Sequence, residues 1–251
     1  MSRKRLCVID GDSLIYIHSW KNKESNNLDD YLSTMRSHIE EILQSTHCEK
    51  YIGFLTISRR ARKDIIKDRE YKKGRAKDKP KFFYELRNYL RDEFGFYYHD
   101  YYEADDMCKY SYDILKNAYN IVIASPDKDL KQFACEFYDY NKMVGETITE
   151  EKAAYNLWYQ VLIGDTTDNI LGLRGVGPVK ASKILDNLHP EEMPIKVFSE
   201  YINVLGLREG VKSLSENIQL VLLFGNPPVV LPDDLKINNL IKEFKFTQDS
   251  W

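Results

Sequence analysis

The stretch that decides the fold is LCVIDGD, residues 6–12, a short apolar run followed by an aspartate, a glycine and a second aspartate. A run bounded in this way by Asp10 and Gly11 is typical of a buried strand and the turn after it. Further strands are expected at 51–57 (YIGFLTI), 96–102 (FYYHDYY), 121–125 (IVIAS) and 135–140 (CEFYDY). Helices are expected at 28–45, from Pro80 to about residue 90, from about residue 103, and from the capping residue Thr149 to Ile163. This alternation predicts an α/β fold with a mostly parallel central sheet flanked by helices.

Length and composition limit the class of protein. The chain has 251 residues, of which 43% are hydrophobic and 30% charged, which suits one large domain or one domain with a small attachment. No apolar run approaches the roughly 20 residues of a membrane span, and the aspartates close to the N-terminus argue against a signal peptide. The cysteines lie far apart without a CxxC pair, so reduced thiols in a cytoplasmic protein are expected at Cys7, Cys48, Cys108 and Cys135.

The formal net charge of −3 conceals a strong asymmetry. Residues 59–81 carry twelve Lys or Arg against four Asp or Glu, a local charge of +8, so the rest of the chain sums to −11. A basic segment in an acidic body indicates one localised anionic contact, although a solvated charged helix would give the same pattern. Because Tyr71 lies within the segment, it also suits a clamp in which Lys and Arg follow phosphates and a ring stacks on a base of single-stranded nucleic acid.

Acidic residues recur at the ends of the expected strands and of one helix. They are Asp10, Asp12, Glu103, Asp105, Asp106, Asp127, Asp129, Asp165 and Asp168. One such pair at a helix start is usually a partner of the helix dipole, but several groups at one edge of a parallel sheet are expected to converge. Converging carboxylates need a counterion, and oxygen ligands without nearby Cys or His suit Mg²⁺ or Mn²⁺. Eight of these carboxylates, all except Asp12, are assigned to metal below and are too many for one Mg²⁺, so two ions and phosphodiester hydrolysis are expected.

A glycine-rich turn follows the last acidic group. LGLRGVGPVKASKIL, residues 171–185, places Gly175 and Gly177 before a helix that contains Lys180. Glycines allow a close approach of the backbone to an anion, and a helix start offers free N–H groups. The turn therefore suits a grip on a phosphate backbone without base reading, while an ordinary turn between helices remains the alternative.

Five blocks of the sequence resemble the structure-specific 5′-nucleases, which comprise flap endonucleases, the 5′–3′ exonuclease domains of bacterial DNA polymerases and their phage relatives. The blocks are VIDGDSLIY (8–16), REYKKGRAK (69–77), YEADDM (102–107), SPDKDLKQF (125–133) and LIGDTTDNILGLRGVGPVKASKIL (162–185). They follow the family order and span roughly residues 6–188. The short chain resembles a free-standing enzyme of the phage type.

The resemblance implies a role for each matching residue. One metal ion would be surrounded by Asp10, Glu103, Asp105, Asp106 and Asp127, and a second served by Asp129, Asp165 and Asp168. The catalytic residues would be Lys72, Asp10, Asp105 and Asp127, with Lys72 approaching the scissile phosphate from a basic arch. DNA would be bound by Arg62, Lys63, Tyr71 as the stacking ring, Lys72, Arg75, Gly175, Gly177 and Lys180. A K⁺ ion near the glycine-rich turn is also implied.

The family also implies an organisation of the chain. Residues 1–163 would form an α/β nuclease core with the arch at about 57–81, and residues 164–251 a helical DNA-binding region with a helix–hairpin–helix-like motif, packed on the core as one compact monomer. One departure is clear, because the family usually has an aspartate shortly after the second strand, where this chain has Thr56 and Ser58. We hypothesise that Asp12 or a water replaces that carboxylate in part.

The expected function is a Mg²⁺-dependent 5′–3′ exonuclease or flap endonuclease of DNA replication or repair. Its substrate would be DNA with a single-stranded 5′ end or flap, and an RNA primer in an RNA–DNA hybrid is a further candidate. Two alternatives remain open: an RNA-processing ribonuclease with a similar acidic site, and a non-catalytic structure-specific DNA-binding protein. Partners among replication proteins are expected. The segment FKFTQDSW, residues 244–251, gives a weak signal for binding to a polymerase clamp protein. The location would be the cytoplasm, that of the host if a phage encodes the protein.

Overall fold

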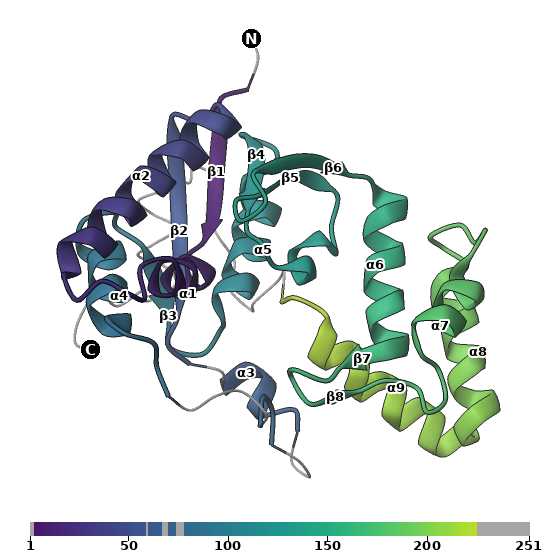
Figure 1. The fold of residues 1–251 in the computed structure, drawn as a ribbon. Coiled ribbons are helices and arrows are strands. Elements are labelled where there is room, and N and C mark those ends of the chain that lie inside the picture. The colour runs from purple at the N-terminus through teal and green to yellow at the C-terminus, as the bar shows by residue number, and fades with distance from the viewer. Residues whose placement is uncertain (1–2, 59, 67–69, 74–77, 225–251) are drawn as a thin grey trace.

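The computed structural model describes residues 3–58, 60–66, 70–73 and 78–224 (Figure 1). These residues form a six-stranded sheet in the order β3-β2-β1-β4-β5-β6. The strands are β1 (Arg5–Asp10), β2 (Lys50–Thr56), β3 (Tyr97–His99), β4 (Asn120–Ala124), β5 (Cys135–Asp139) and β6 (Val144–Ile148). The strands β1 to β5 pair in parallel, and β6 pairs antiparallel with β5. The α/β fold with a mostly parallel sheet is therefore confirmed.

Helices cover both faces of this sheet (Figure 1). On one face, α1 (Asp12–Lys21), α2 (Leu28–Thr46) and α4 (Phe83–Asp92) pack on Cys7 and Ile9 of β1. On the other face, α5 (Ala104–Leu115) and the 3-10 helix η1 (Lys128–Lys131) pack on Leu6 and Val8. Successive side chains of a strand point to opposite faces, so the unbroken apolar run of β1 supplies both cores, as is usual for a parallel strand.

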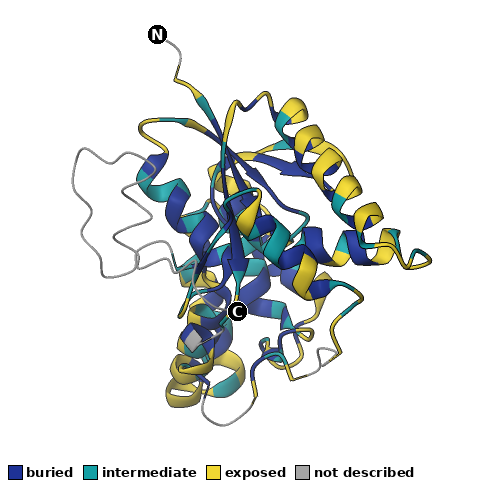
Figure 2. Ribbon diagram, turned by 90° about the vertical axis from the view of Figure 1, so that its left-hand side faces the viewer, coloured by how far each residue is buried: buried dark blue, intermediate teal, exposed yellow. Residues whose placement is uncertain are grey.

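The second half of the chain is mainly helical. It contains α6 (Glu150–Ile163), the short hairpin β7 (Gly164–Asp165) and β8 (Ile170–Leu171), α7 (Pro178–Leu185), α8 (Met193–Leu205) and α9 (Leu207–Val221). These helices bury a third hydrophobic cluster, which also includes Ile66 and Tyr71 of the basic segment. Figure 2 shows the buried sheet between helices whose outer faces are exposed. None of the helices that the structure describes is long and apolar enough to cross a membrane.

Local signals explain where α6 begins and how the chain leaves it. Thr149 caps the helix as expected, because its Oγ1 accepts a 3.2 Å hydrogen bond from the backbone N–H of Lys152. After the helix, Gly164 and Gly172 bring two backbone segments into close contact. A Cβ atom on Gly172 would lie 2.3 Å from the carbonyl carbon of Ile163, and Gly164 has a φ of +70°. Only glycine fits this crossing without displacement of the backbone.

The strand order places the candidate site. The chain runs from β1 to its neighbour β2 on one side, whereas β4 pairs with the other side of β1, so the carboxyl ends of β1 and β4 flank the switch point of the sheet. Ligands of open α/β sheets bind at this position. Asp10 ends β1, and Asp127 follows β4. The expected convergence of acidic residues at one edge follows from this topology.

The structure departs from the sequence expectations in several elements. Helix α1 and strand β6 were not predicted; Val144, Gly145 and Thr147 of β6 are exposed, so the strand lacks an apolar signature. The third strand covers only Tyr97–His99, because a bend follows it. Of the arch expected at about 57–81, the described residues include the short helix α3 (Arg60–Lys63) and a turn at 71–73. Arg75 and the segment FKFTQDSW lie outside the described residues.

Candidate active site

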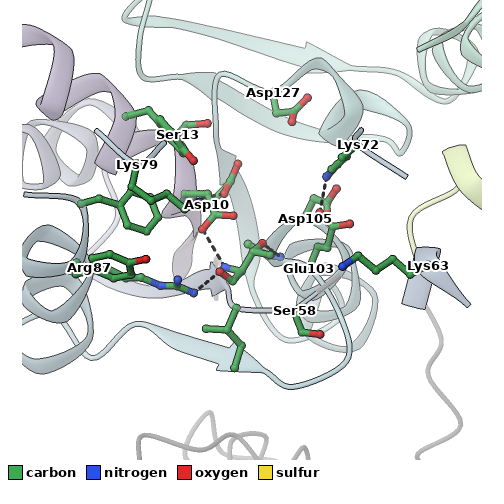
Figure 3. Close-up of a pocket in the computed structure, with 17 residues that line it drawn as sticks. Asp10, Ser13, Ser58, Lys63, Lys72, Lys79, Arg87, Glu103, Asp105 and Asp127 are labelled. Carbon is green, nitrogen blue, oxygen red and sulfur yellow. Dashed lines mark hydrogen bonds and ion pairs between the residues drawn. The ribbon is translucent and has the colours of Figure 1, made fainter. Parts of the chain in front are cut away.

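A cavity of about 480 Å³ opens at the carboxyl edge of the sheet (Figure 3). Its floor carries the carboxylates of Asp10, Glu103, Asp105 and Asp127. Its remaining walls come from α1, α4, the end of β2 and the basic segment, which contributes Lys63, Lys72 and Lys79. Acidic and basic side chains therefore line the same cavity.

Hydrogen bonds hold both the side chain and the backbone of Asp10. Its Oδ2 accepts a 2.9 Å hydrogen bond from Ser125 Oγ, and its backbone carbonyl accepts a 2.6 Å hydrogen bond from the hydroxyl of Tyr140. Burial, and then the negative charges of Asp12 and Asp127, raise the pKa of Asp10 well above its usual range. A buried carboxylate in this setting strongly favours a cation as its neighbour.

Asp127 and Asp129 belong to the start of η1. The carboxylate of Asp127 caps this turn and accepts a 2.9 Å hydrogen bond from the backbone N–H of Asp129. Gln160 of α6 donates a 2.8 Å hydrogen bond from Nε2 to Oδ1 of Asp129. Burial is the main cause that raises the pKa of Asp129 to about 7, and the charge of Asp127 adds to it. Burial also raises the pKa of Asp127.

Glu103 and Asp106 form the capping box of α5, each side chain accepting a hydrogen bond from the backbone N–H of the other. Both side chains face Arg62 from the basic segment. The Arg62 guanidinium lies 2.8 Å from each Asp106 carboxylate oxygen and 3.4 Å from Oε1 of Glu103. Burial raises the pKa of Asp106 to about 7, although Arg62 acts in the opposite direction. Asp105 is less buried and lines the cavity.

Asp165 and Asp168 lie at the β7–β8 hairpin, beside the basic segment. Asp168 Oδ2 accepts a 3.1 Å hydrogen bond from the hydroxyl of Tyr71 and lies 3.5 Å from Lys72 Nζ. The same ammonium is 2.5 Å from Oε2 of Glu103. Lys72 thereby links the acidic hairpin to the start of α5. Lys128 forms a 3.3 Å ion pair with Asp165.

The residues expected to bind DNA have different environments. Lys63 is exposed and extends toward the carboxylates (Figure 3), and the chain is exposed at Gly175, Gly177 and Lys180. Tyr71 is only 5% exposed, so its ring could stack on a base only after leaving the core. Arg62 is 2% exposed and fully engaged with carboxylates and backbone. Neither of these two side chains is presented to solvent.

The position of the missing aspartate is filled by a different set of interactions. The backbone N–H of Thr56 donates a 2.9 Å hydrogen bond to Oδ1 of Asp12, and the carbonyl of Thr56 accepts one from Arg87 of α4. Burial lowers the pKa of Arg87 to about 10. Asp12 lines the cavity, as its hypothesised role requires. Sequence reasoning missed Arg87, since nothing in a helix stripe marks an inward-facing arginine.

The donor set fits a divalent cation by its chemistry, because carboxylate oxygens are the ligands that Mg²⁺ prefers. Within the described residues, no three His, Cys, Asp or Glu side chains are grouped as a metal centre. Ammonium and guanidinium groups lie among the carboxylates instead, as Arg62, Lys72 and Lys128 show. In this conformation the carboxylates of the site therefore pair with basic side chains of the same chain.

Comparison with known proteins gives a consistent picture, although no known family model matches the chain. A 5′-3′ exonuclease of Aquifex aeolicus is 31% identical over 147 residues, which is 54% of this chain and 50% of the relative. A 5′-3′ exonuclease of Mycoplasma genitalium is 26% identical over 180 residues, covering 58% of this chain and 62% of the relative. The chain therefore spans about half to three fifths of the length of these curated relatives.

The fold comparison extends over more of the chain. A bacteriophage T5 flap endonuclease, solved as a pseudo-enzyme-product complex with DNA and metal ions, has a TM-score of 0.65 at 19% identity. The likeness covers 88% of this chain and 90% of that one. At this identity it shows the shared fold. The names of the sequence relatives and the shared fold both agree with the resemblance that the five sequence blocks carry.

Proposed function

We propose that this chain is a metal-dependent 5′-nuclease that hydrolyses DNA phosphodiesters near a free 5′ end or at a junction of single strand and duplex. The observation that carries the proposal is the cavity in which Asp10, Asp105 and Asp127 face Lys63 and Lys72. A phosphoryl-transfer site needs two components: carboxylates that bind metal cations, and ammonium groups opposite them that bind the phosphate. The names of the sequence relatives agree with this activity.

Each group of residues has a role in this proposal. Asp10, Glu103, Asp105 and Asp127 would hold one Mg²⁺, and Asp129, Asp165 and Asp168 a second, with Mn²⁺ as a substitute. Bound there, the ions supply Lewis acidity and a water of lowered pKa. Lys72 would stabilise negative charge on the phosphate after its ammonium leaves the ion pairs with Glu103 and Asp168. Lys63 brings a second cation to the mouth of the cavity.

The helical region would hold the uncleaved duplex. Gly175 has a φ of +76°, and added Cβ atoms at Gly175 and Gly177 would meet nothing within 4 Å. Both positions are exposed before α7, so a DNA backbone could approach them closely. We assign residues 164–251 to this helix–hairpin–helix-like grip, with Lys180 and a K⁺ ion contributing positive charge, and residues 1–163 to the nuclease core.

A cleavage assay on a 5′-flap duplex tests the proposal. The wild-type protein should cleave with Mg²⁺ or Mn²⁺ and be inactive in EDTA. Asp127→Asn should lower kcat by at least about 100-fold, because one ligand is lost from a charged site, while DNA affinity in EDTA changes little. The matched control is Asp92→Asn, since Asp92 pairs with Arg91 at the surface end of α4.

The same assay separates the alternatives. Binding of the flap duplex without cleavage under any metal would identify a non-catalytic DNA-binding protein. Faster cleavage of structured RNA than of the DNA flap would identify a ribonuclease. An RNA–DNA hybrid with a 5′ RNA end tests the further proposal of primer removal in replication. Sedimentation of the protein with and without DNA tests the proposed monomer.

A further inference from the structure

All three nitrogens of the Arg62 guanidinium donate hydrogen bonds inside the protein. Its Nη1 and Nη2 each donate a 2.8 Å hydrogen bond to Asp106, in the parallel arrangement that fits a carboxylate best. Its Nε donates a 3.1 Å hydrogen bond to the carbonyl of Leu220, at the end of α9. The ring of Phe224 lies 5.6 Å from the guanidinium carbon. A side chain that is 2% exposed and held in this way is not placed to contact a phosphate.

Asp106 is equally committed. Oδ1 accepts hydrogen bonds from Arg62 Nη2 and from the backbone N–H of Phe224, at 2.8 and 3.2 Å. Oδ2 accepts from Arg62 Nη1 and from the backbone N–H of Glu103, also at 2.8 and 3.2 Å. A carboxylate offers about four lone-pair sites, and four donors occupy them. A metal ion could bind Asp106 only if one of these hydrogen bonds broke.

The neighbouring Asp105 provides the contrast. Its side chain is 18% exposed, against 1% for Asp106, and it lines the cavity that Asp106 does not line. Arg62 Nη2 lies 3.7 Å from Asp105 Oδ2. Two consecutive acidic residues at the start of α5 therefore face different surroundings, one the cavity and the other a buried arginine.

We propose that Arg62 and Asp106 form a buried positioning pair, and that Asp106 neutralises Arg62 instead of binding metal. The pair joins the base of the basic segment, the start of α5 and the end of α9. Because Arg62 also contacts Glu103 and Asp105, it sets the orientation of both carboxylates toward the cavity. This role in catalysis rests on the proposed nuclease function, whereas the pairing itself does not.

Unfolding in EDTA tests the pairing without metal or activity. Removing one member of a buried ion pair leaves an uncompensated charge, so Arg62→Met and Asp106→Leu should each lower Tm by roughly 10 °C. The double variant Arg62→Met with Asp106→Leu should recover most of that loss, because no buried charge remains. Asp105→Asn, the matched acidic control, should leave Tm unchanged or raise it by removing like-charge repulsion. Additive losses in the double variant would overturn the pairing.

Metal and DNA titrations test the two roles that the pair replaces. With Asp106→Asn, calorimetric Mn²⁺ binding should keep its stoichiometry, whereas Asp105→Asn should lose a site or most of its affinity. DNA affinity in EDTA should stay within about twofold for Arg62→Met, with an unchanged salt slope, whereas the exposed control Lys63→Met should lower that slope by about one. A lost Mn²⁺ site in Asp106→Asn, or a lowered slope in Arg62→Met, would refute the proposal.

Arg62→Lys serves if Arg62→Met does not fold, since it keeps the charge but not the two parallel hydrogen bonds. At a temperature where this variant is fully folded, kcat should fall about 10-fold with KM for DNA unchanged, because the carboxylates lose their orientation. An unchanged kcat would leave Arg62 a purely structural residue and refute the positioning role. If the wild-type protein neither binds Mn²⁺ nor cleaves, the nuclease proposal fails, and the unfolding cycle still decides the pairing.

Discussion

Ser125 joins the acidic residue that ends β1 to the one that follows β4: its Oγ donates a 2.9 Å hydrogen bond to Oδ2 of Asp10 and accepts a 3.0 Å hydrogen bond from the backbone N–H of Asp127. One hydroxyl thus fixes the spacing between the ends of β1 and β4. Ser125 is fully buried, so water cannot take over this role without a rearrangement.

Ser125→Ala should therefore weaken the site more than the fold. We expect Mn²⁺ affinity and kcat to fall about 10-fold, since the hydroxyl orients two proposed ligands. The free energy of unfolding should fall by only about 1–2 kcal/mol. Calorimetric titration and urea unfolding measure the two effects, and Ser33→Ala on the exposed side of α2 is the control. Equal Mn²⁺ binding in wild type and variant would contradict this role.

Asp12 is expected to compensate for the missing aspartate near Thr56. Asp12→Asn keeps an acceptor for the N–H of Thr56 but removes the charge. If the compensation is correct, the Mg²⁺ concentration for half-maximal cleavage should rise about 10-fold, with Tm nearly unchanged. A metal titration identical to wild type would reject the compensation and assign Asp12 to the end of β2 alone.

Asp129 predicts a pH dependence of stability. Its pKa in the folded protein is about 7, against the ordinary value of 3.8. Between these values the unfolded chain has lost the proton that the folded protein keeps, so this group stabilises the fold below about pH 4 and loses that contribution as the pH rises to about 7. Asp129→Asn should therefore gain stability relative to wild type as the pH rises across this range.

Urea unfolding in EDTA at pH 4.5, 6 and 7.5 checks this difference between variant and wild type. Taking the difference removes contributions from groups that do not interact with Asp129, such as His18, whose pKa burial lowers to about 3. A stability difference that does not change with pH would show that Asp129 titrates normally. For metal binding the same proton competes with the cation, so Mg²⁺ affinity should fall as the pH drops below 7.

The glycine-rich stretch contains two glycines with opposite requirements. Gly172→Ala should destabilise the protein by more than about 2 kcal/mol, because its Cβ would lie 2.3 Å from the backbone of Ile163. Gly177→Ala should leave stability unchanged, since its Cβ would meet no atom within 4 Å. If the turn binds the DNA backbone closely, Gly177→Ala should lower duplex affinity severalfold. Unchanged affinity would remove Gly177 from the proposed grip.

Local sequence patterns were sufficient for the five parallel strands and for the acidic groups that follow them. An apolar run such as LCVI predicts a strand that is buried on both faces, as β1 is. Because β1 and β4 are parallel, the residues that end or follow them, such as Asp10 and Asp127, lie at one edge of the sheet. Strand β6 escaped prediction because four of its residues face solvent fully or in part.

The surroundings of individual side chains could not be read from the sequence. A run of basic residues indicates an exposed face, but Arg62 is buried because carboxylates more than 40 positions later surround it. Tyr71 is buried for a similar reason, since Asp168 and the third hydrophobic cluster enclose it. Ser125 carried a local signal, because a serine two residues before Asp127 can accept its backbone N–H. Gln160, which donates a hydrogen bond to Asp129, carried no such local signal.

The end of α9 sets a practical limit on shortening the protein. Gln132 donates a 3.0 Å hydrogen bond to the carbonyl of Val221, and the backbone N–H of Phe224 reaches Asp106. A truncation before Phe224 would therefore expose the inner face of the nuclease core and remove a donor from a buried carboxylate. A shortened version of this protein should therefore run through residue 224, because the end of the helical region completes the surroundings of Asp106 and Gln132.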